Sequence, residues 1–126
     1  TYMIITHNLN LVGEVADRVV VMYLGRIVEV GTTDQVFDAP AHPYTVALLS
    51  AISEPDPRQR SESRRLLLKG EIPSAKNPPP GCCFVSRCTQ PSAACRETMP
   101  KLQEVAPGHL VACRNWRHVQ RELLGE

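Results

Sequence analysis

The stretch that decides the fold spans residues 18–31. It reads Arg18-Val19-Val20-Val21-Met22-Tyr23-Leu24, then Gly25-Arg26, then Ile27-Val28-Glu29-Val30-Gly31. Two runs rich in β-branched residues flank a two-residue step that contains glycine, a pattern typical of a β-hairpin. We therefore expect two neighbouring strands here.

Two helices are predicted directly after this hairpin. Thr32 and Gln35 occupy the N-cap and N3 positions of a capping box, which predicts a short helix over residues 33–38. Pro43 suits a first helical position, and the apolar residues after it predict a helix over residues 44–52. Two prolines then end this second helix.

The segment before the hairpin has the pattern of half an α/β unit. Residues 2–6 form an apolar, β-branched run that predicts a fully covered parallel strand. His7 follows at the carboxyl end of this strand, where ligands usually bind in such sheets. Asn8 could cap a helix over residues 9–17. A chain that opens inside a buried strand is expected to be a fragment of a longer protein.

The second half of the chain differs in composition from the first. Residues 54–65 are polar and mixed in charge, and they predict a linker between residues 1–53 and an appendage over residues 66–126. The appendage is predicted to contain a short strand at 66–68, a Pro-rich loop at 73–81, irregular chain around its cysteines, and a helix from Trp116 to Leu124. The fold class is thus an α/β fragment with an irregular, cysteine-rich appendage.

The appendage is marked by its cysteines. Cys82, Cys88, Cys95 and Cys113 lie in a region poor in apolar residues, and Cys83 adjoins the first of them. Burial alone does not explain how such a tail holds together, so a metal centre or disulfides are expected to cross-link it. Four thiolates can hold a [4Fe–4S] cluster. Zinc is an alternative, although its usual closely spaced cysteine pairs are missing, and disulfides are a third.

Composition excludes two classes of function. The formal net charge is +1, from 14 basic and 13 acidic residues, and no basic stripe interleaves with aromatic residues. We therefore expect no nucleic-acid partner. The apolar runs are far shorter than the roughly 20 residues that a membrane span requires.

Several segments, in order, resemble the C-terminal part of the ATP-binding subunits of oligopeptide/dipeptide-type ABC transporters. The first, Ile4-Ile5-Thr6-His7-Asn8-Leu9, is similar to the switch-histidine loop. The strand pair at 16–31 follows, and Ala41-His42-Pro43-Tyr44 resembles the His-Pro-Tyr motif of this family. The remaining matches are Gly70-Glu71-Ile72-Pro73, Gly81-Cys82-Cys83-Phe84-Val85-Ser86-Arg87-Cys88 and Pro107-Gly108-His109-Leu110-Val111-Ala112-Cys113.

The resemblance implies that the intact subunit is an ATPase. In this family, the histidine that corresponds to His7 contacts the γ-phosphate of ATP and helps to place the attacking water. ATP and Mg²⁺ would be the cofactors there. The present sequence contains no phosphate-binding loop, no Leu-Ser-Gly-Gly-Gln signature and no catalytic carboxylate pair. We therefore expect that this chain alone does not hydrolyse ATP.

The resemblance also implies partners and a metal centre. The partners would be a second ATPase subunit and transmembrane permease subunits, with a solute-binding protein acting indirectly, at the cytoplasmic face of the membrane. Many of these subunits carry a [4Fe–4S] cluster in the appendage, which implies the ligands Cys82, Cys88, Cys95 and Cys113. Cys83 departs from the family pattern and could substitute for Cys82. Adjacent side chains of an extended segment point in opposite directions, so only one of the two is expected to ligate.

Several other residues have an ordinary interpretation beside a functional one. Tyr44 and His42 are expected to pack rather than to bind a ligand. Trp116 could shield the metal centre or simply pack, and Arg87 and Arg96 could offset the charge of thiolates or simply be solvated. His109 and His118 are expected to be surface or packing residues. The rival hypothesis for the whole chain is an independent metal-binding interaction module with a structural or redox-sensing role.

Overall fold

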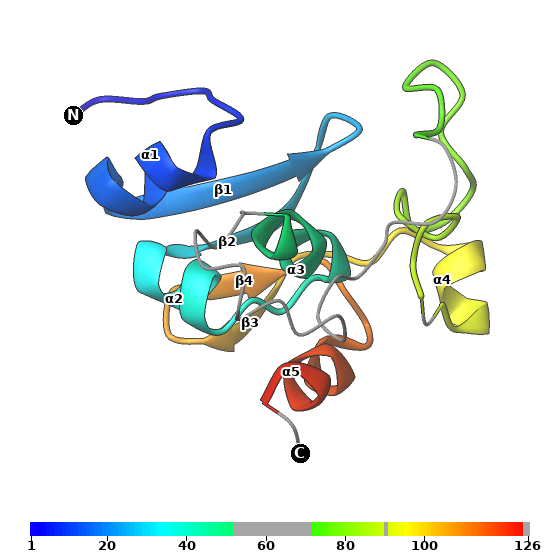
Figure 1. The fold of residues 1–126 in the computed structure, drawn as a ribbon. Helices are drawn as coiled ribbons and strands as arrows, with labels where there is room; N and C mark the ends of the chain where they lie inside the picture. The colour runs from blue at the N-terminus through cyan, green and yellow to red at the C-terminus, as the bar shows by residue number, and fades with distance from the viewer. Residues whose placement is uncertain (52–71, 90, 125–126) are drawn as a thin grey trace.

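The computed structural model describes residues 1–51, 72–89 and 91–124. Its centre is a four-stranded antiparallel sheet in the order β1-β2-β4-β3 (Figure 1). The strands are β1 (Arg18–Tyr23), β2 (Arg26–Thr32), β3 (Gln103–Ala106) and β4 (His109–Val111). The predicted hairpin is confirmed as β1 and β2, and its turn is formed by Leu24 and Gly25, one residue earlier than expected. Both turn residues have positive φ, 50° and 73°, which is the geometry of a tight hairpin turn.

Five helices surround the sheet within the described residues. They are α1 (Leu9–Val15), α2 (Thr33–Asp38), α3 (Pro43–Ser50), α4 (Ala93–Glu97) and α5 (Trp116–Leu124). The side chain of Asn8 caps α1, and both hydrogen bonds of the capping box between Thr32 and Gln35 form at the start of α2. Pro43 begins α3. The predicted helices of the first half and the last helix are therefore confirmed, although the end of the second prediction, Ile52, lies outside the described residues.

The predicted parallel strand at residues 2–6 is wrong. These residues form no strand, and their apolar side chains are open to solvent, with Tyr2 95 % and Ile5 91 % exposed. A strand requires a neighbour that pairs with its backbone, and none of the four described strands pairs with this segment. The described sheet is consequently antiparallel throughout, rather than the parallel sheet that the sequence pattern favoured.

The prediction of irregular chain around the cysteines is also wrong in part. Cys95 lies within α4, and the chain before Cys113 forms the β3–β4 hairpin. This hairpin joins the sheet because β4 pairs with β2, with Glu29 opposite Val111 and Val30 opposite Leu110. Residues 73–81 contain neither helix nor strand, as predicted. The expected linker at 54–65 and strand at 66–68 lie outside the described residues.

The larger part of the core joins the hairpin, α3 and the cysteine-bearing loop. Phe84 is 2 % exposed, and its ring meets those of Tyr23, His42 and Tyr44 at centroid distances of 5.2, 5.6 and 5.7 Å. Tyr23 and Tyr44 also contact each other at 4.7 Å. In Figure 1 the cysteine-bearing loop (residues 81–88) and α4, coloured green to yellow, lie at the same end of the sheet as the β1–β2 turn.

Candidate functional site

Cys82 and Cys95 are brought together by a backbone contact between the cysteine loop and α4. The amide of Cys82 donates to the carbonyl oxygen of Cys95 at 2.7 Å. Gly81 permits this close approach, since its φ is +81° and a Cβ at this position would overlap the same carbonyl. The hydroxyl of Ser92 lies 3.1 Å from the Cys95 sulfur.

Cys88 ends the same loop, which turns back on itself around Phe84. The amides of Arg87 and Cys88 donate to the carbonyl of Phe84 at 3.0 and 2.9 Å, and the amide of Val85 donates to the carbonyl of Cys82 at 3.1 Å. The buried ring of Phe84 thus anchors a loop whose two ends carry Cys82 and Cys88. Cys88 is the most exposed of these thiols, being half-buried.

Cys113 reaches the same region from β4. The amide of Ala112 donates to the carbonyl of Val28 on β2 at 2.8 Å, which holds the chain immediately before Cys113 against the hairpin. Burial raises the pKa of Cys113 to about 12, and repulsion from the thiolates of Cys88, Cys82 and Cys95 adds to the rise. Cys113 is therefore close enough to the other three cysteines for their thiolates to act on it electrostatically.

The adjacent pair Cys82 and Cys83 is asymmetric. A hydrogen bond to Cys83, followed by burial, raises the pKa of Cys82 to about 12, and the same hydrogen bond lowers the pKa of Cys83. The Cys83 sulfur also lies 3.8 Å from the carbonyl oxygen of Tyr23, toward the core. Cys82, but not Cys83, belongs to the set of thiols that raises the pKa of Cys113.

His42 contributes a donor to this region. Its Nδ1 accepts from the amide of Tyr44 at 3.0 Å at the start of α3. In a neutral imidazole the proton then resides on Nε2, which is available to a second partner. A hydrogen bond from His42 favours the thiolate of Cys82 and so opposes the rise in the pKa of Cys82. The expected packing roles of His42 and Tyr44 are confirmed by their contacts with Phe84, and His42 has this polar contact as well.

The donor set has the chemistry of a thiolate metal centre but not the geometry of a site for a single ion. Within residues 1–51, 72–89 and 91–124, no group of three or more His, Cys, Asp or Glu side chains is placed to hold a metal ion. No disulfide bond joins the described cysteines. The zinc alternative is thus unsupported, because zinc requires its ligands to converge on one point.

Sequence analysis missed a buried polar pair that contacts the start of α3. Glu29 and His109 are 0 % and 2 % exposed, and His109 Nε2 lies 2.6 Å from Glu29 Oε1. The carboxylate also accepts from the amides of Ala41 and His42, at 2.9 and 3.1 Å. His109 was expected to be a surface or packing residue; it is buried, and its hydrogen-bonded pair with Glu29 was not expected.

A β-bulge explains why Glu29 faces the core. Val21 pairs with Glu29 and Met22 pairs with Ile27, so Val28 is an extra residue on β2. A bulge shifts the alternation of side chains, and here both Val28 and Glu29 are buried. The available signal in the sequence was a carboxylate between two valines of a predicted strand, because an acidic group that is buried in such a position needs partners.

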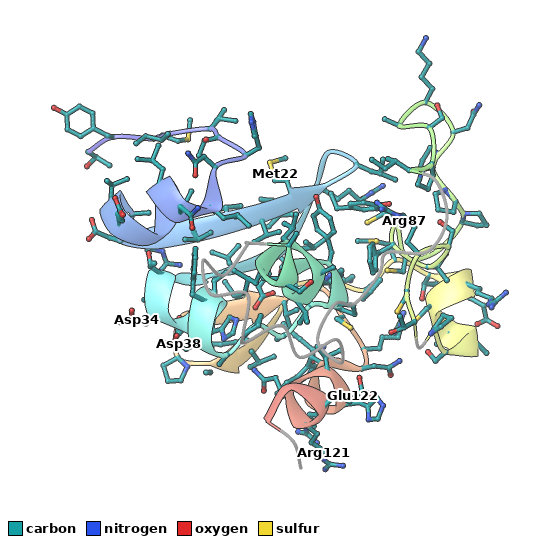
Figure 2. The ribbon with its side chains drawn as sticks, in the orientation of Figure 1. Met22, Asp34, Asp38, Arg87, Arg121 and Glu122 are labelled. Atoms are coloured by element: carbon teal, nitrogen blue, oxygen red, sulfur yellow. The ribbon has the colours of Figure 1, made fainter. Side chains whose placement is uncertain are left out.

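The other candidate residues are distributed around this region. His7 lies in the exposed segment before α1. Arg87, labelled in Figure 2, is 8 % exposed, and its guanidinium carbon lies 6.0 Å from the ring centroid of Tyr23 on β1. Arg96 is exposed. Trp116 packs against the small cluster that contains Cys113. His118 is exposed and pairs with Glu122.

Membrane insertion by a helix finds no support in the described residues, where every helix is too short or too polar to cross a bilayer.

Comparison with known proteins gives a consistent result. Residues 28–95, more than half of the chain, match the family described as the oligopeptide/dipeptide transporter, C-terminal region. The chain is 45 % identical over 120 residues to a provisionally named oligopeptide transport ATP-binding protein, YkfD, of Bacillus subtilis, covering 95 % of this chain and 36 % of YkfD. It is 50 % identical over 113 residues to the dipeptide transport ATP-binding protein DppF of Haemophilus influenzae, covering 90 % of this chain and 34 % of DppF.

The chain thus spans about a third of the length of the curated relatives that it matches. The alternative of an independent metal-binding module is not supported, because the similarity covers nearly the whole chain and no metal-ion group occurs among the described side chains. Because residues 28–95 match the family, the chain belongs to the family described as the oligopeptide/dipeptide transporter, C-terminal region.

Proposed function

We propose that this chain is the C-terminal part of the ATP-binding subunit of an ABC importer for peptides or related solutes. The main support for this proposal is the 45–50 % identity, over at least 90 % of the chain, to ATP-binding proteins named for peptide transport. In the intact subunit, ATP binding and hydrolysis would drive transport together with a second ATPase subunit and membrane permease subunits. The subunit would lie at the cytoplasmic face of the membrane, and residues 54–65 would separate its two parts.

His7 is the proposed contact between this chain and ATP. An imidazole can donate a hydrogen bond to a phosphate oxygen while its second nitrogen is held by a neighbour. His7 lies in the exposed segment before α1, where it is accessible to a nucleotide held by other parts of the subunit. The groups that cradle the phosphates and Mg²⁺ are not in this sequence, so the chain alone is expected to be inactive.

A chimera tests this proposal directly. The chain would replace the corresponding third of DppF of Haemophilus influenzae, and ATP binding and phosphate release would be measured with the permease partners present. We expect the chimera to hydrolyse ATP and its His7→Ala form to bind ATP with hydrolysis reduced at least about a hundredfold, as for the loss of a group that stabilises the transition state. A well-folded chimera that hydrolyses ATP equally well with alanine at position 7 would contradict the role of His7.

We further propose that Cys82, Cys88, Cys95 and Cys113 hold a [4Fe–4S] cluster. In such a cluster each thiolate binds a different iron, so the four sulfurs need to be neighbours without converging on one point. The electrostatic effect of Cys82, Cys88 and Cys95 on Cys113, and the backbone hydrogen bond between Cys82 and Cys95, support this proposal. The cluster would supply charge and rigidity where the loop, α4 and the end of β4 meet.

Iron analysis of protein prepared without oxygen tests the cluster. We expect about four irons per chain and a brown colour, both lost in Cys113→Ser and both retained in Cys83→Ser. Retention of iron in Cys113→Ser together with loss in Cys83→Ser would assign the ligands differently. Colourless, iron-free wild-type protein would exclude the cluster.

A further inference from the structure

The buried carboxylate of Glu29 joins three segments that are distant in the sequence. It lies on β2, accepts from the amides of Ala41 and His42 at the start of α3, and contacts the ring of His109 at the start of β4. Glu29 is fully buried, so it exchanges no hydrogen bonds with water. A buried carboxylate is destabilising unless all its partners are in place. Loss of one of the three contacts is therefore expected to weaken the other two.

The partners of Glu29 connect it to the first and the last of the four cysteines. On one side, His42 makes a side-chain hydrogen bond to Cys82 and packs against Phe84, which anchors the cysteine loop. On the other side, His109 opens the short strand that ends just before Ala112 and Cys113. The first and the last of the four cysteines are thus connected to the same carboxylate.

The sheet alone gives the β4 segment few contacts. Only two ladder pairs, Glu29 with Val111 and Val30 with Leu110, join β4 to β2, and β3 is the outer neighbour of β4. Beyond the ladder, three described hydrogen bonds join the β3–β4 hairpin and Ala112 to the first half of the chain. The amide of Ala112 donates to the carbonyl of Val28 at 2.8 Å, the side chain of Gln35 donates to the carbonyl of Pro107 at 2.9 Å, and His109 contacts Glu29. The Glu29–His109 contact is the buried, charge-assisted one among them, and such hydrogen bonds are roughly twice as strong as neutral ones.

We infer that Glu29 is a positioning residue that holds Cys82 and Cys113 at a common site. Through the amide of His42 it fixes the start of α3 and hence the imidazole that meets Cys82. Through the ring of His109 it fixes the position of β4 and hence Cys113. This role depends only on contacts within the chain, to two backbone amides and one histidine ring, and it stands whether or not the thiols hold a metal.

Thiol alkylation measured one cysteine at a time tests the inference on reduced, metal-free chain. The variants are Glu29→Gln, which removes the charge with little change in shape, and His109→Leu, which removes the ring nitrogens. We expect alkylation of Cys113 to accelerate at least about tenfold relative to Cys83, which contacts Tyr23 in the core. His109→Gln keeps a side-chain N–H donor and should restore part of the protection.

The chain provides a matched control pair. His118 and Glu122 are also a histidine and a glutamate in contact, at 3.5 Å, but both are about half exposed on α5. Glu122 is labelled in Figure 2, on the helix that lies below the sheet. His118→Leu and Glu122→Gln should leave every alkylation rate within about twofold of the wild type, because exposed pairs contribute little.

A second control separates positioning from general loss of stability. Val36 is buried on α2 in the larger core cluster, and Val36→Ala would destabilise the fold while leaving the side chains of Glu29 and its hydrogen-bond partners unchanged. This variant should accelerate the alkylation of Cys83 and Cys113 together. The inference is overturned if Glu29→Gln and His109→Leu produce this same uniform rise, or if they leave Cys113 as protected as in the wild type. Iron content is not part of this readout, so failure of the proposed cluster would not alter the result.

Discussion

Replacement of Phe84 by alanine should remove a large part of the stability of the fold. The ring is almost fully buried and contacts three rings, of Tyr23, His42 and Tyr44, within 5.7 Å. Loss of a buried phenylalanine side chain costs about 3–5 kcal/mol through lost transfer energy and the cavity left behind. Small domains have only about 5–15 kcal/mol in total, so the change should be easily detected.

Urea unfolding followed by circular dichroism measures this loss. With a slope of about 2 kcal/mol per molar urea, a loss of 4 kcal/mol lowers the midpoint by about 2 M. Phe84→Leu retains most of the burial and should lose less. Tyr2→Ala removes an aromatic ring that is 95 % exposed and should shift the free energy of unfolding by no more than about 0.5 kcal/mol.

The reasoning would be refuted if Phe84→Ala and Tyr2→Ala had the same midpoint. That result would mean that the cysteine-bearing loop does not pack its ring between the hairpin and α3. The iron-free, reduced chain should be used, so that packing is measured without any contribution from a bound metal.

Three further predictions concern local features. Gly81→Ala should destabilise the chain by at least about 2 kcal/mol more than Gly25→Ala, because both have positive φ but only the former meets backbone atoms, and equal thermal midpoints would contradict this. In the reduced, metal-free chain, Cys113 should react with iodoacetamide about a thousandfold more slowly at pH 8 than an ordinary thiol. Its pKa is raised from 9.0 to about 12, and the rate should climb as the pH rises toward that value; a plateau near pH 9 would exclude the shift. Thr32→Ala should cost about 1 kcal/mol in chemical denaturation through loss of the capping box at α2, and an unchanged midpoint would show that this cap is dispensable.

The sequence predicted the local elements of the first half because their signals are local. The hairpin follows from two β-branched runs around a glycine, and α2 and α3 follow from a capping box and a first-turn proline. Each of these features is contained within a few residues, so no knowledge of the rest of the fold is needed. The same reasoning failed for residues 2–6, because an apolar run predicts a strand only when another strand is available to pair with it.

The sequence could single out the cysteines as a candidate site, but it could not predict the contacts that surround them. The spacing of cysteines singled out the thiols, and the family resemblance selected Cys82 over Cys83. The bonds that organise them join residues far apart in sequence, such as Glu29 to His109 and Cys82 to Cys95. No local pattern encodes such pairs, and the bulge that turns Glu29 inward depends on the register of a neighbouring strand.

The structure changes the physical account of the cysteine-bearing tail. Its composition suggested that burial could not hold it together and that a cross-link was required. Yet the tail itself supplies Phe84 to the larger core and Val111 and Ala112 to the buried side of the sheet. It also adds two strands to the hairpin, so its backbone groups pair with those of the first half. Packing and strand pairing therefore organise the tail, and the thiols are brought together by a fold that extends across both halves of the chain.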